Sequence, residues 1–107
     1  MKIEADDFAK LKKQSKQRFE FHCIIMEVPG MMQEYKFHPT RRWRFDYYNP
    51  KTNTGYEYEG IAGHGKMRHT TMPGYTKDCE KYNEAGKLGI IVYRFTALNY
   101  KQVTNYL

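Results

Sequence analysis

The sequence predicts one domain over residues 1–107, of the α/β class with an α+β mixed sheet, with elements in the order α-β-β-β-α-β and a short C-terminal helix. Three observations predict this order. Apolar residues recur at helical spacing in two stretches, near the N-terminus and after residue 75. Three short segments between residues 34 and 59 alternate polar and aromatic side chains, as strands do. A β-branched and aromatic run after the second helix predicts a fourth strand.

The first helix is expected over residues 5–19, where a few apolar side chains are spaced among many Lys and Gln. Asp6 and Asp7 at its start suit the positive end of the helix dipole. Its basic outer face is read as solvated, with phosphate contact as the alternative. Residues 21–26 are apolar and could prolong the helix or begin a strand before Pro29-Gly30 forces a turn.

The first three strands are expected over residues 34–38, 42–48 and 56–59, and the last two form a hairpin around the turn formers of 49–55. Alternation places five aromatic residues on one face of the hairpin, which is expected to pack in the core. They are Trp43, Phe45, Tyr47, Tyr56 and Tyr58.

The second half of the chain predicts a loop, a helix, a strand and a last helix. Residues 60–74 are rich in Gly and basic side chains and suit a mobile loop over a site. A helix is expected over 75–85, and the run 90–95 is typical of a strand buried on both faces of a sheet. Thr96 can cap the last helix, in which Tyr100, Val103 and Leu107 share one side.

Composition indicates a globular protein with an anionic partner. Lys and Arg number 18 against 12 Asp and Glu, a formal charge of +6, which favours a polyanion such as nucleic acid. No apolar run approaches the roughly 20 residues that a membrane span needs, so no membrane partner is expected. Acidic residues stand where a signal peptide would be apolar, so a reducing cytoplasm is expected. Cys23 and Cys79 are then predicted to be buried free thiols.

Three carboxylates on the hairpin carry the chemical hypothesis. Glu57 and Glu59 are two residues apart, so in a strand both project from one face. Asp46 has the parity opposite to its aromatic neighbours, so all three acids should converge on the face away from the core. One interpretation is a wet face paired with Arg42, Arg44 and nearby lysines. The other is a site for a hard, oxygen-binding ion such as Mg²⁺.

Four segments of the chain decide between these interpretations. They are Glu34-Tyr-Lys-Phe-His-Pro-Thr-Arg-Arg-Trp-Arg-Phe-Asp46, Glu57-Tyr-Glu-Gly60, Arg68-His69 and Asp78-Cys-Glu-Lys-Tyr-Asn83. Together they resemble small phage and prophage members of the PD-(D/E)XK nuclease superfamily, which has the restriction-endonuclease-like fold. The resemblance covers about residues 34–96 and implies an αβββαβ core. It further implies that Asp46 is the first metal-binding acid and Glu57 the acid of the (D/E)XK element. Glu59 departs from the pattern, since it stands where the family has lysine.

The chemistry of phosphodiester hydrolysis assigns roles to the remaining candidates. Mg²⁺, for which Mn²⁺ is expected to substitute, would be bound by Asp46, Glu57 and the Tyr58 carbonyl, with Glu59 holding a second ion or acting as general base. His69 and Lys81 are preferred as replacements for the missing lysine. Glu34 and Glu20 are further possible ligands, each with a surface carboxylate as the alternative. The expected nucleic-acid contacts are Arg41, Arg42, Arg44, Lys66, Arg68 and Lys77.

The resulting expectation is a Mg²⁺-dependent DNA endonuclease, acting as a homodimer in the cytoplasm of a bacterial host and related to phage proteins. So short a chain has no second domain for reading bases, so a structure-directed substrate is expected, either duplex or branched DNA such as a Holliday junction. The alternative is a nucleic-acid-binding module of the same fold that has lost catalysis, with Glu59 as the sign of the loss. An RNA-directed nuclease or a phage protein that binds a host protein is the third possibility.

Overall fold

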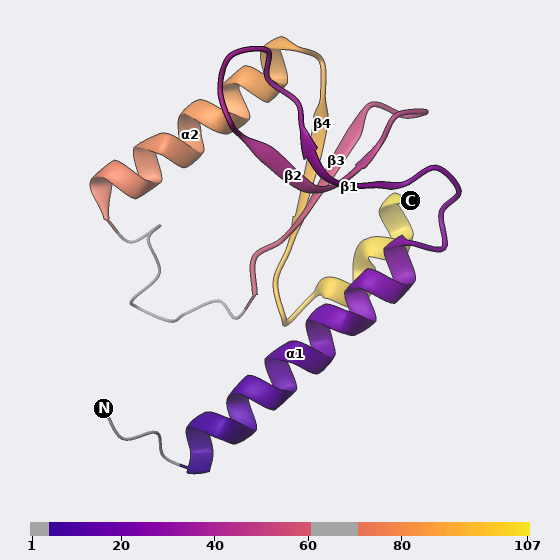
Figure 1. The fold of residues 1–107 in the computed structure, drawn as a ribbon, viewed down its shortest axis with the longest axis vertical. Helices are drawn as coiled ribbons and strands as arrows, with labels where there is room; N and C mark the ends of the chain where they lie inside the picture. The colour runs from indigo at the N-terminus through magenta and orange to yellow at the C-terminus, as the bar shows by residue number, and fades with distance from the viewer. Residues whose placement is uncertain (1–4, 61–70) are drawn as a thin grey trace.

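A four-stranded mixed sheet with the strand order β1-β2-β3-β4 organises the chain (Figure 1). The structure is a computed structural model that describes residues 5–60 and 71–107, with the side chains of these residues apart from 5–12 and 14. Neighbours β1 and β2, and β2 and β3, are antiparallel, whereas β3 and β4 are parallel. A parallel pair needs a crossover connection, and α2 lies within it. The elements are α1 (Ala5–Ile25), β1 (Met32–Lys36), β2 (Arg44–Asn49), β3 (Thr54–Tyr58), α2 (Met72–Lys87), β4 (Ile91–Phe95) and the 3₁₀ helix η2 (Tyr100–Tyr106).

This order confirms the predicted α/β class with a mixed sheet, although element boundaries differ. Strand β1 lies two residues earlier than predicted, and α2 begins earlier because Pro73 fits the first turn of a helix. The last element is a 3₁₀ helix whose N-cap is Asn99, so Thr96 is not its cap as predicted. Instead the Asn99 side chain accepts a hydrogen bond from the Thr96 backbone N–H at 2.7 Å. The predicted loop over residues 60–74 falls mostly on 61–70, outside the described residues.

The undecided segment 21–26 continues helix α1 to Ile25. Phe21 and Ile25 are four residues apart on one helix face, and both side chains are fully buried. Chain reversal follows at Gly30, whose φ of +84° suits glycine. The last turns of α1 pack beside η2, as Figure 1 shows. No helix within residues 5–60 and 71–107 combines the length and apolarity of a membrane span.

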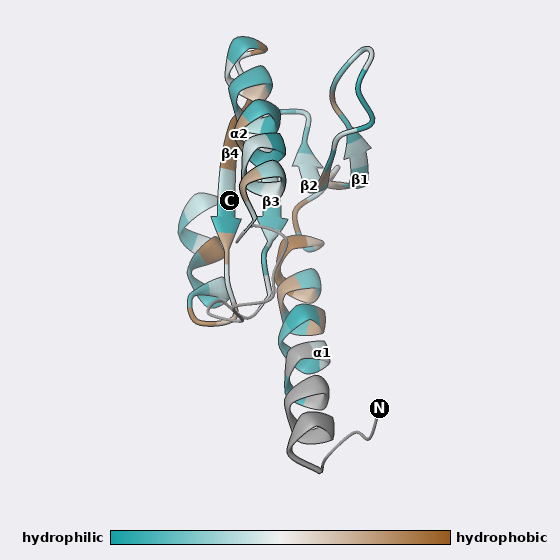
Figure 2. Ribbon diagram, turned by 90° about the vertical axis from the view of Figure 1, so that its left-hand side faces the viewer, coloured by the Kyte–Doolittle hydropathy of each residue, from teal (hydrophilic) through white to brown (hydrophobic). Residues whose placement is uncertain are grey.

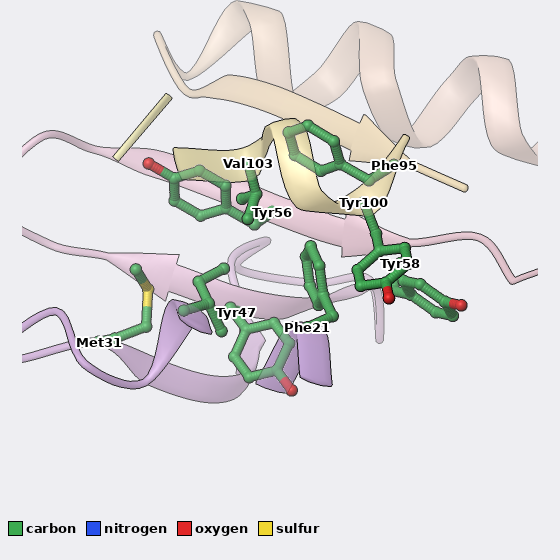
Figure 3. Close-up of a cluster of buried hydrophobic side chains, with 9 residues drawn as sticks. Phe21, Met31, Tyr47, Tyr56, Tyr58, Phe95, Tyr100 and Val103 are labelled. Carbon is green, nitrogen blue, oxygen red and sulfur yellow. The ribbon is translucent and has the colours of Figure 1, made fainter. Parts of the chain in front are cut away.

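The two faces of the sheet carry separate aromatic clusters. On the α1 and η2 side, Phe21, Tyr47, Tyr56, Tyr58 and Phe95 pack with Tyr100 and Val103 (Figure 3). On the α2 side, Phe37, Phe45 and Tyr48 pack against Ala85, with Trp43 beside them. The prediction that all five hairpin aromatics share one face is therefore wrong, since Trp43 and Phe45 lie in the second cluster.

This division coincides with an interruption of the strand pairing at Asp46. Pairing between β2 and β3 runs from Asn49 opposite Thr54 to Tyr47 opposite Tyr56 and stops there. Beyond that point Phe45 turns to the α2 side, although it is only two residues from Tyr47 on the other side. The Asp46 side chain accepts the Tyr58 backbone N–H at 2.8 Å, so it satisfies a donor that the ladder no longer pairs.

Strand β4 lies at an edge of the sheet, so the prediction that residues 90–95 are buried on both faces is wrong. Within residues 5–60 and 71–107, β3 is its only strand neighbour, and Ile91 is 52% exposed. Packing covers it in part: Val92 contacts the α2-side cluster, and Phe95 lies in the other cluster. Figure 2 shows α2 running alongside β3 and β4.

Both cysteines are free, as predicted, but both are exposed, so the prediction of burial is wrong. Cys23 lies two residues from Phe21 and two from Ile25, which places it on the face of α1 opposite these buried side chains. On α2 the half-buried or buried positions are Gly74, Asp78, Lys81, Tyr82, Glu84 and Ala85. Cys79 lies between these positions and is exposed.

Replacing Gly55 by Ala should destabilise the fold by about 1–3 kcal/mol because it overpacks the core. A Cβ at Gly55 would lie 2.7 Å from the fully buried ring of Phe45. Urea denaturation followed by circular dichroism measures the change. Gly86→Ala is the matched control, since no atom lies within 4 Å of its Cβ position on α2, and it should leave stability equal or about 0.5–1 kcal/mol higher. Equal effects of the two substitutions would contradict the packing explanation.

Candidate functional site

A buried carboxylate lies between the sheet and α2. Among the described residues Glu57 is the one buried charged residue, 7% exposed. Alternation along β3 directs Tyr56 and Tyr58 into the α1-side cluster and Glu57 toward α2. There Glu57 Oε1 accepts a hydrogen bond from Lys81 Nζ, and Oε2 accepts one from the Tyr82 hydroxyl. A buried charge is tolerated when it is paired and hydrogen-bonded, and Glu57 has both kinds of partner.

Helix α2 positions these two partners. Its N-cap is Thr71, whose hydroxyl accepts the Gly74 backbone N–H at 3.2 Å. From this start, Lys81 and Tyr82 fall on the sheet-facing side one turn before the buried Ala85. The Lys81 ammonium also lies 5.5 Å from the centroid of the Phe45 ring, which holds the side chain against the sheet. Lys81, one of the two residues preferred from sequence, is thus at the buried acid.

Glu59 extends the polar cluster toward β4. Its Oε1 accepts a hydrogen bond from Arg94 Nε at 2.8 Å and lies 3.5 Å from the Tyr82 hydroxyl. Arg94 reaches it because β3 and β4 are parallel, with Glu57 opposite Arg94 in the register. The Arg94 guanidinium also covers the Tyr82 ring, 4.3 Å from its centroid. The Tyr82 hydroxyl thus lies between two acid–cation pairs, Glu57–Lys81 and Glu59–Arg94. Glu57 and Glu59 share one face of the sheet, as predicted from the sequence.

Asp46 lies on the neighbouring strand and has other partners. Its Oδ2 accepts the Tyr58 N–H, and its Oδ1 is 4.0 Å from Arg18 Nη2 of α1. Extending the β2–β3 register by one step past Tyr47 and Tyr56 sets Asp46 opposite Glu57. Even so, within the described ranges no three His, Cys, Asp or Glu side chains form a group that could hold a metal ion. The expected convergence of three acids is therefore met by Glu57 and Glu59 but not by Asp46.

The alternative of a wet, arginine-paired face is met in part, since Asp46 and Glu59 face arginines, but these are Arg18 and Arg94 rather than Arg42 and Arg44. Glu57 is buried rather than wet, and its cation is Lys81 from α2. Arg44 lies near Glu34 instead, with 4.0 Å between Arg44 Nη1 and Glu34 Oε2.

Burial sets the protonation behaviour of the cluster. It raises the pKa of Glu57, and the Glu59 charge raises it further, whereas Lys81 and the Tyr82 hydroxyl oppose the rise. Burial also raises the pKa of Tyr82, and the carboxylate of Glu57 adds to the rise. Tyr82 therefore stays a hydrogen-bond donor over the whole physiological range. Glu57 is an acid whose charged form depends on the ammonium of Lys81.

A cationic cavity adjoins the buried pair. It has a volume of about 430 Å³ and lies between the β1–β2 side of the sheet and α2. Its charged lining residues are Glu34, Arg42, Arg44, Lys77, Asp78 and Lys81. Three of the predicted nucleic-acid contacts, Arg42, Arg44 and Lys77, thus line the same cavity as Lys81, the cation that pairs with Glu57. Four cations against two carboxylates suit a phosphate backbone better than a neutral ligand.

Other predicted site residues lie elsewhere. Arg41 is outside this cavity and stacks on Trp43. Glu34 lines the cavity but is exposed, and Glu20 accepts a hydrogen bond from the Tyr100 hydroxyl at the α1–η2 contact, so neither joins Glu57. Tyr58 offers its N–H to Asp46 while its ring lies in the core. Lys66, Arg68 and His69 fall within 61–70, outside the described residues.

Two members of the cluster, Tyr82 and Arg94, were not singled out from the sequence as site residues. Tyr82 directly follows Lys81, and its position one turn before Ala85 already places it on the same helix face. Arg94 is the one charged residue in the run Ile91–Phe95. Its parity separates it from Tyr93 and Phe95, which was a usable signal that it lies on the other face. Its pairing with Glu59 depends on the parallel register, which periodicity does not give.

Comparison of the chain with protein-family models, with curated proteins and with solved structures gives no match. The site is therefore interpreted from its own geometry.

Replacing Lys81 by Met should destabilise the protein by about 3–5 kcal/mol near neutral pH because it leaves Glu57 buried without its cation. The loss should shrink as the pH falls to about 5. A carboxyl whose folded pKa is raised favours the folded state below its unfolded pKa and loses that contribution as pH rises through the folded value. Urea denaturation at the two pH values measures both effects. Lys77→Met, a change of the same type in the same cavity, should shift stability by no more than about 0.5 kcal/mol.

A double variant tests the cause of this loss. Adding Glu57→Gln to Lys81→Met removes the stranded charge, so the double variant should be more stable than Lys81→Met at neutral pH. If the double variant is less stable at both pH values, the lysine acts through packing alone.

Proposed function

We propose that the protein is a metal-dependent endonuclease that hydrolyses DNA phosphodiester bonds, with a restriction-endonuclease-like core of the PD-(D/E)XK type. The observation that carries the proposal is the position of Lys81, whose ammonium binds the buried Glu57 and which is also one of the residues that line the cationic cavity. An acid at the end of a central strand, with a lysine between it and a phosphate-binding surface, is the pair that this chemistry requires. The order α-β-β-β-α-β and the mixed sheet agree with such a core.

The lysine that the family pattern has in place of Glu59 is supplied here from α2. Glu59 is occupied by Arg94, and Lys81 holds the position at Glu57 instead. Positive charge near the scissile phosphate stabilises the negative charge that develops during hydrolysis, and it is most effective where water is excluded. Lys81 meets this condition because its side chain is 14% exposed. In the proposed enzyme, Lys81 therefore stabilises the phosphate, while Arg42, Arg44 and Lys77 hold the adjoining backbone.

The carboxylates of Asp46 and Glu57 fit a hard divalent ion by residue type. Mg²⁺ and Mn²⁺ prefer oxygen donors, and these two acids lie on adjacent strands one register step beyond the last β2–β3 pair. When bound, such an ion supplies a polarised water and positive charge at the phosphate. Glu57 would exchange one of its present partners for the ion. Lys81, freed from Oε1, would then face the phosphate in the cavity. Asp46 would contribute Oδ1, whose present cation is the distant Arg18.

A nucleic-acid-binding module without catalysis is the second candidate, and one observation favours it. Each of the three acids has a cation partner: Asp46 has Arg18, Glu57 has Lys81 and Glu59 has Arg94. Acids neutralised within the protein could serve the fold alone, while the cationic cavity still binds DNA. Binding of this kind would persist in EDTA and weaken steeply as salt rises.

Cleavage of plasmid and branched DNA in Mg²⁺ or Mn²⁺ tests the proposal. The unmodified protein should cut, EDTA should abolish cutting, and Asp46→Asn should lower the rate about 100-fold or more. Lys81→Met should lower it similarly, once circular dichroism shows that the variant is folded. Glu27→Gln, which removes an exposed carboxylate after α1, is the matched control and should cut at the normal rate. DNA binding without cleavage in either metal would instead identify the binding module.

A further inference from the structure

A second cavity lies on the other side of Trp43. It has a volume of about 420 Å³, and Trp43 lines both this cavity and the cationic one. Its other lining residues include His38, Arg41, Glu80, Asn83 and Glu84. A ligand long enough to pass Trp43 could therefore occupy both cavities at once. A DNA strand bound for cleavage next to Lys81 is such a ligand, so the inference rests on the proposed function.

The charges of the two cavities differ in sign. The cationic cavity has four Lys and Arg side chains against two carboxylates. The second cavity has Arg41 against the carboxylates of Glu80 and Glu84. A phosphate is attracted to the first cavity and repelled from the second. The second cavity is therefore suited to an uncharged planar group next to a phosphate, which in nucleic acids is a base.

Arg41 and Trp43 form a stacked pair at the wall of this cavity. The Arg41 guanidinium carbon lies 4.1 Å from the centroid of the Trp43 ring. Glu80 Oε2 holds the guanidinium from α2 at 3.6 Å, and the side chain remains 50% exposed. The indole is fixed in turn by Phe37, which is nearly parallel to it at 14°, and by the edge of His38, 5.2 Å away. Arginine planes and aromatic rings are the surfaces on which unpaired bases stack.

His38 anchors the turn that presents this pair. Its Nδ1 accepts the backbone N–H groups of Thr40 and Arg41, at 3.2 and 3.0 Å. Since Nδ1 is the acceptor, Nε2 carries the proton and donates a hydrogen bond to Glu84 Oε1 at 3.0 Å. The turn is thereby tied to α2 at the floor of the cavity. A surface for stacking held from two elements loses little conformational freedom when a ligand binds.

Asn83 is the uncharged polar residue on α2 that lines this cavity. Among the described residues its side-chain amide has no hydrogen-bond partner, although Glu80 and Glu84 on the same helix are paired with Arg41 and Lys87. An amide both donates and accepts, so it can pair with the edge of a base.

We propose that this second cavity receives an unpaired nucleobase, stacked on the Arg41–Trp43 pair, while the neighbouring phosphates lie in the cationic cavity. A base inside a continuous duplex is covered on both faces by its neighbours and cannot enter. The protein therefore prefers DNA with unpaired bases, such as single strands, flaps and branches, over continuous duplex. Stacking contributes about 1–3 kcal/mol per base, which corresponds to a preference of about 5- to 150-fold.

Trp43 is the chain's single tryptophan, so its fluorescence reports on this cavity directly. Titration with an oligothymidylate and with a blunt duplex of equal length, both in EDTA, gives two dissociation constants without cleavage. The single strand should quench Trp43, and the duplex should not. Arg41→Ala should weaken single-strand binding at least fivefold more than duplex binding. Arg42→Ala removes the same charge one residue away, from the cationic cavity, and should weaken both equally. Asn83→Ala should weaken binding of the single strand and leave binding of the duplex unchanged.

The outcomes separate this inference from the proposed function. Base binding would be overturned by equal quenching with both DNAs. It would also be overturned if Arg41→Ala and Arg42→Ala gave the same ratio of single-strand to duplex dissociation constants. Neither result would bear on the proposed nuclease activity. Selective quenching by the single strand without cleavage in Mg²⁺ or Mn²⁺ would support base binding and overturn the nuclease. An absence of binding to either DNA at low salt would overturn both.

Discussion

The burial of Glu57 against α2 is the constraint on which the rest of the site depends. A carboxylate that leaves water must be paired, and its partners must be held by the same packing that excludes the water. Lys81 and Tyr82 meet this need because they sit on the sheet-facing side of α2. The same contact that joins the helix to the sheet therefore also creates the Glu57–Lys81 pair. The fold and the candidate chemistry share one interaction.

The second feature that shapes the site is the point where the pairing between β2 and β3 ends, after Tyr47 and Tyr56. Where pairing stops, the Asp46 carboxylate takes over a backbone donor, and the aromatic residues on either side of Asp46 pack on different faces. The divergence has two effects. It gives each face of the sheet its own aromatic cluster, and the Asp46 carboxylate contacts the Tyr58 backbone N–H and Arg18 rather than the partners of Glu57. A regular hairpin would have placed Asp46 on the same face as Glu57, toward α2.

The charged side chains of the protein are unevenly distributed between the two cavities. A net charge of +6 describes the whole chain, but Arg42, Arg44, Lys77 and Lys81 gather around one cavity. On the other side of Trp43, the carboxylates of α2 outnumber the single arginine. A strand of DNA passing this boundary would meet an attractive surface for its backbone and a less cationic one for its bases. The distribution can distinguish parts of one ligand, which the total charge cannot.

By itself the sequence determined the types of the elements and their order, because side-chain periodicity follows from backbone geometry over a few residues. It also placed Glu57 and Glu59 on one face and gave Lys81, together with His69, as a candidate to replace the missing lysine. The tertiary structure alone decided that Phe45 and Tyr47 lie on opposite faces, that β4 is an edge strand and that Arg94 pairs with Glu59. Each of these depends on which distant segment packs beside which. A central strand and an edge strand have the same side-chain alternation, so the alternation does not tell which strand lies beside either of them.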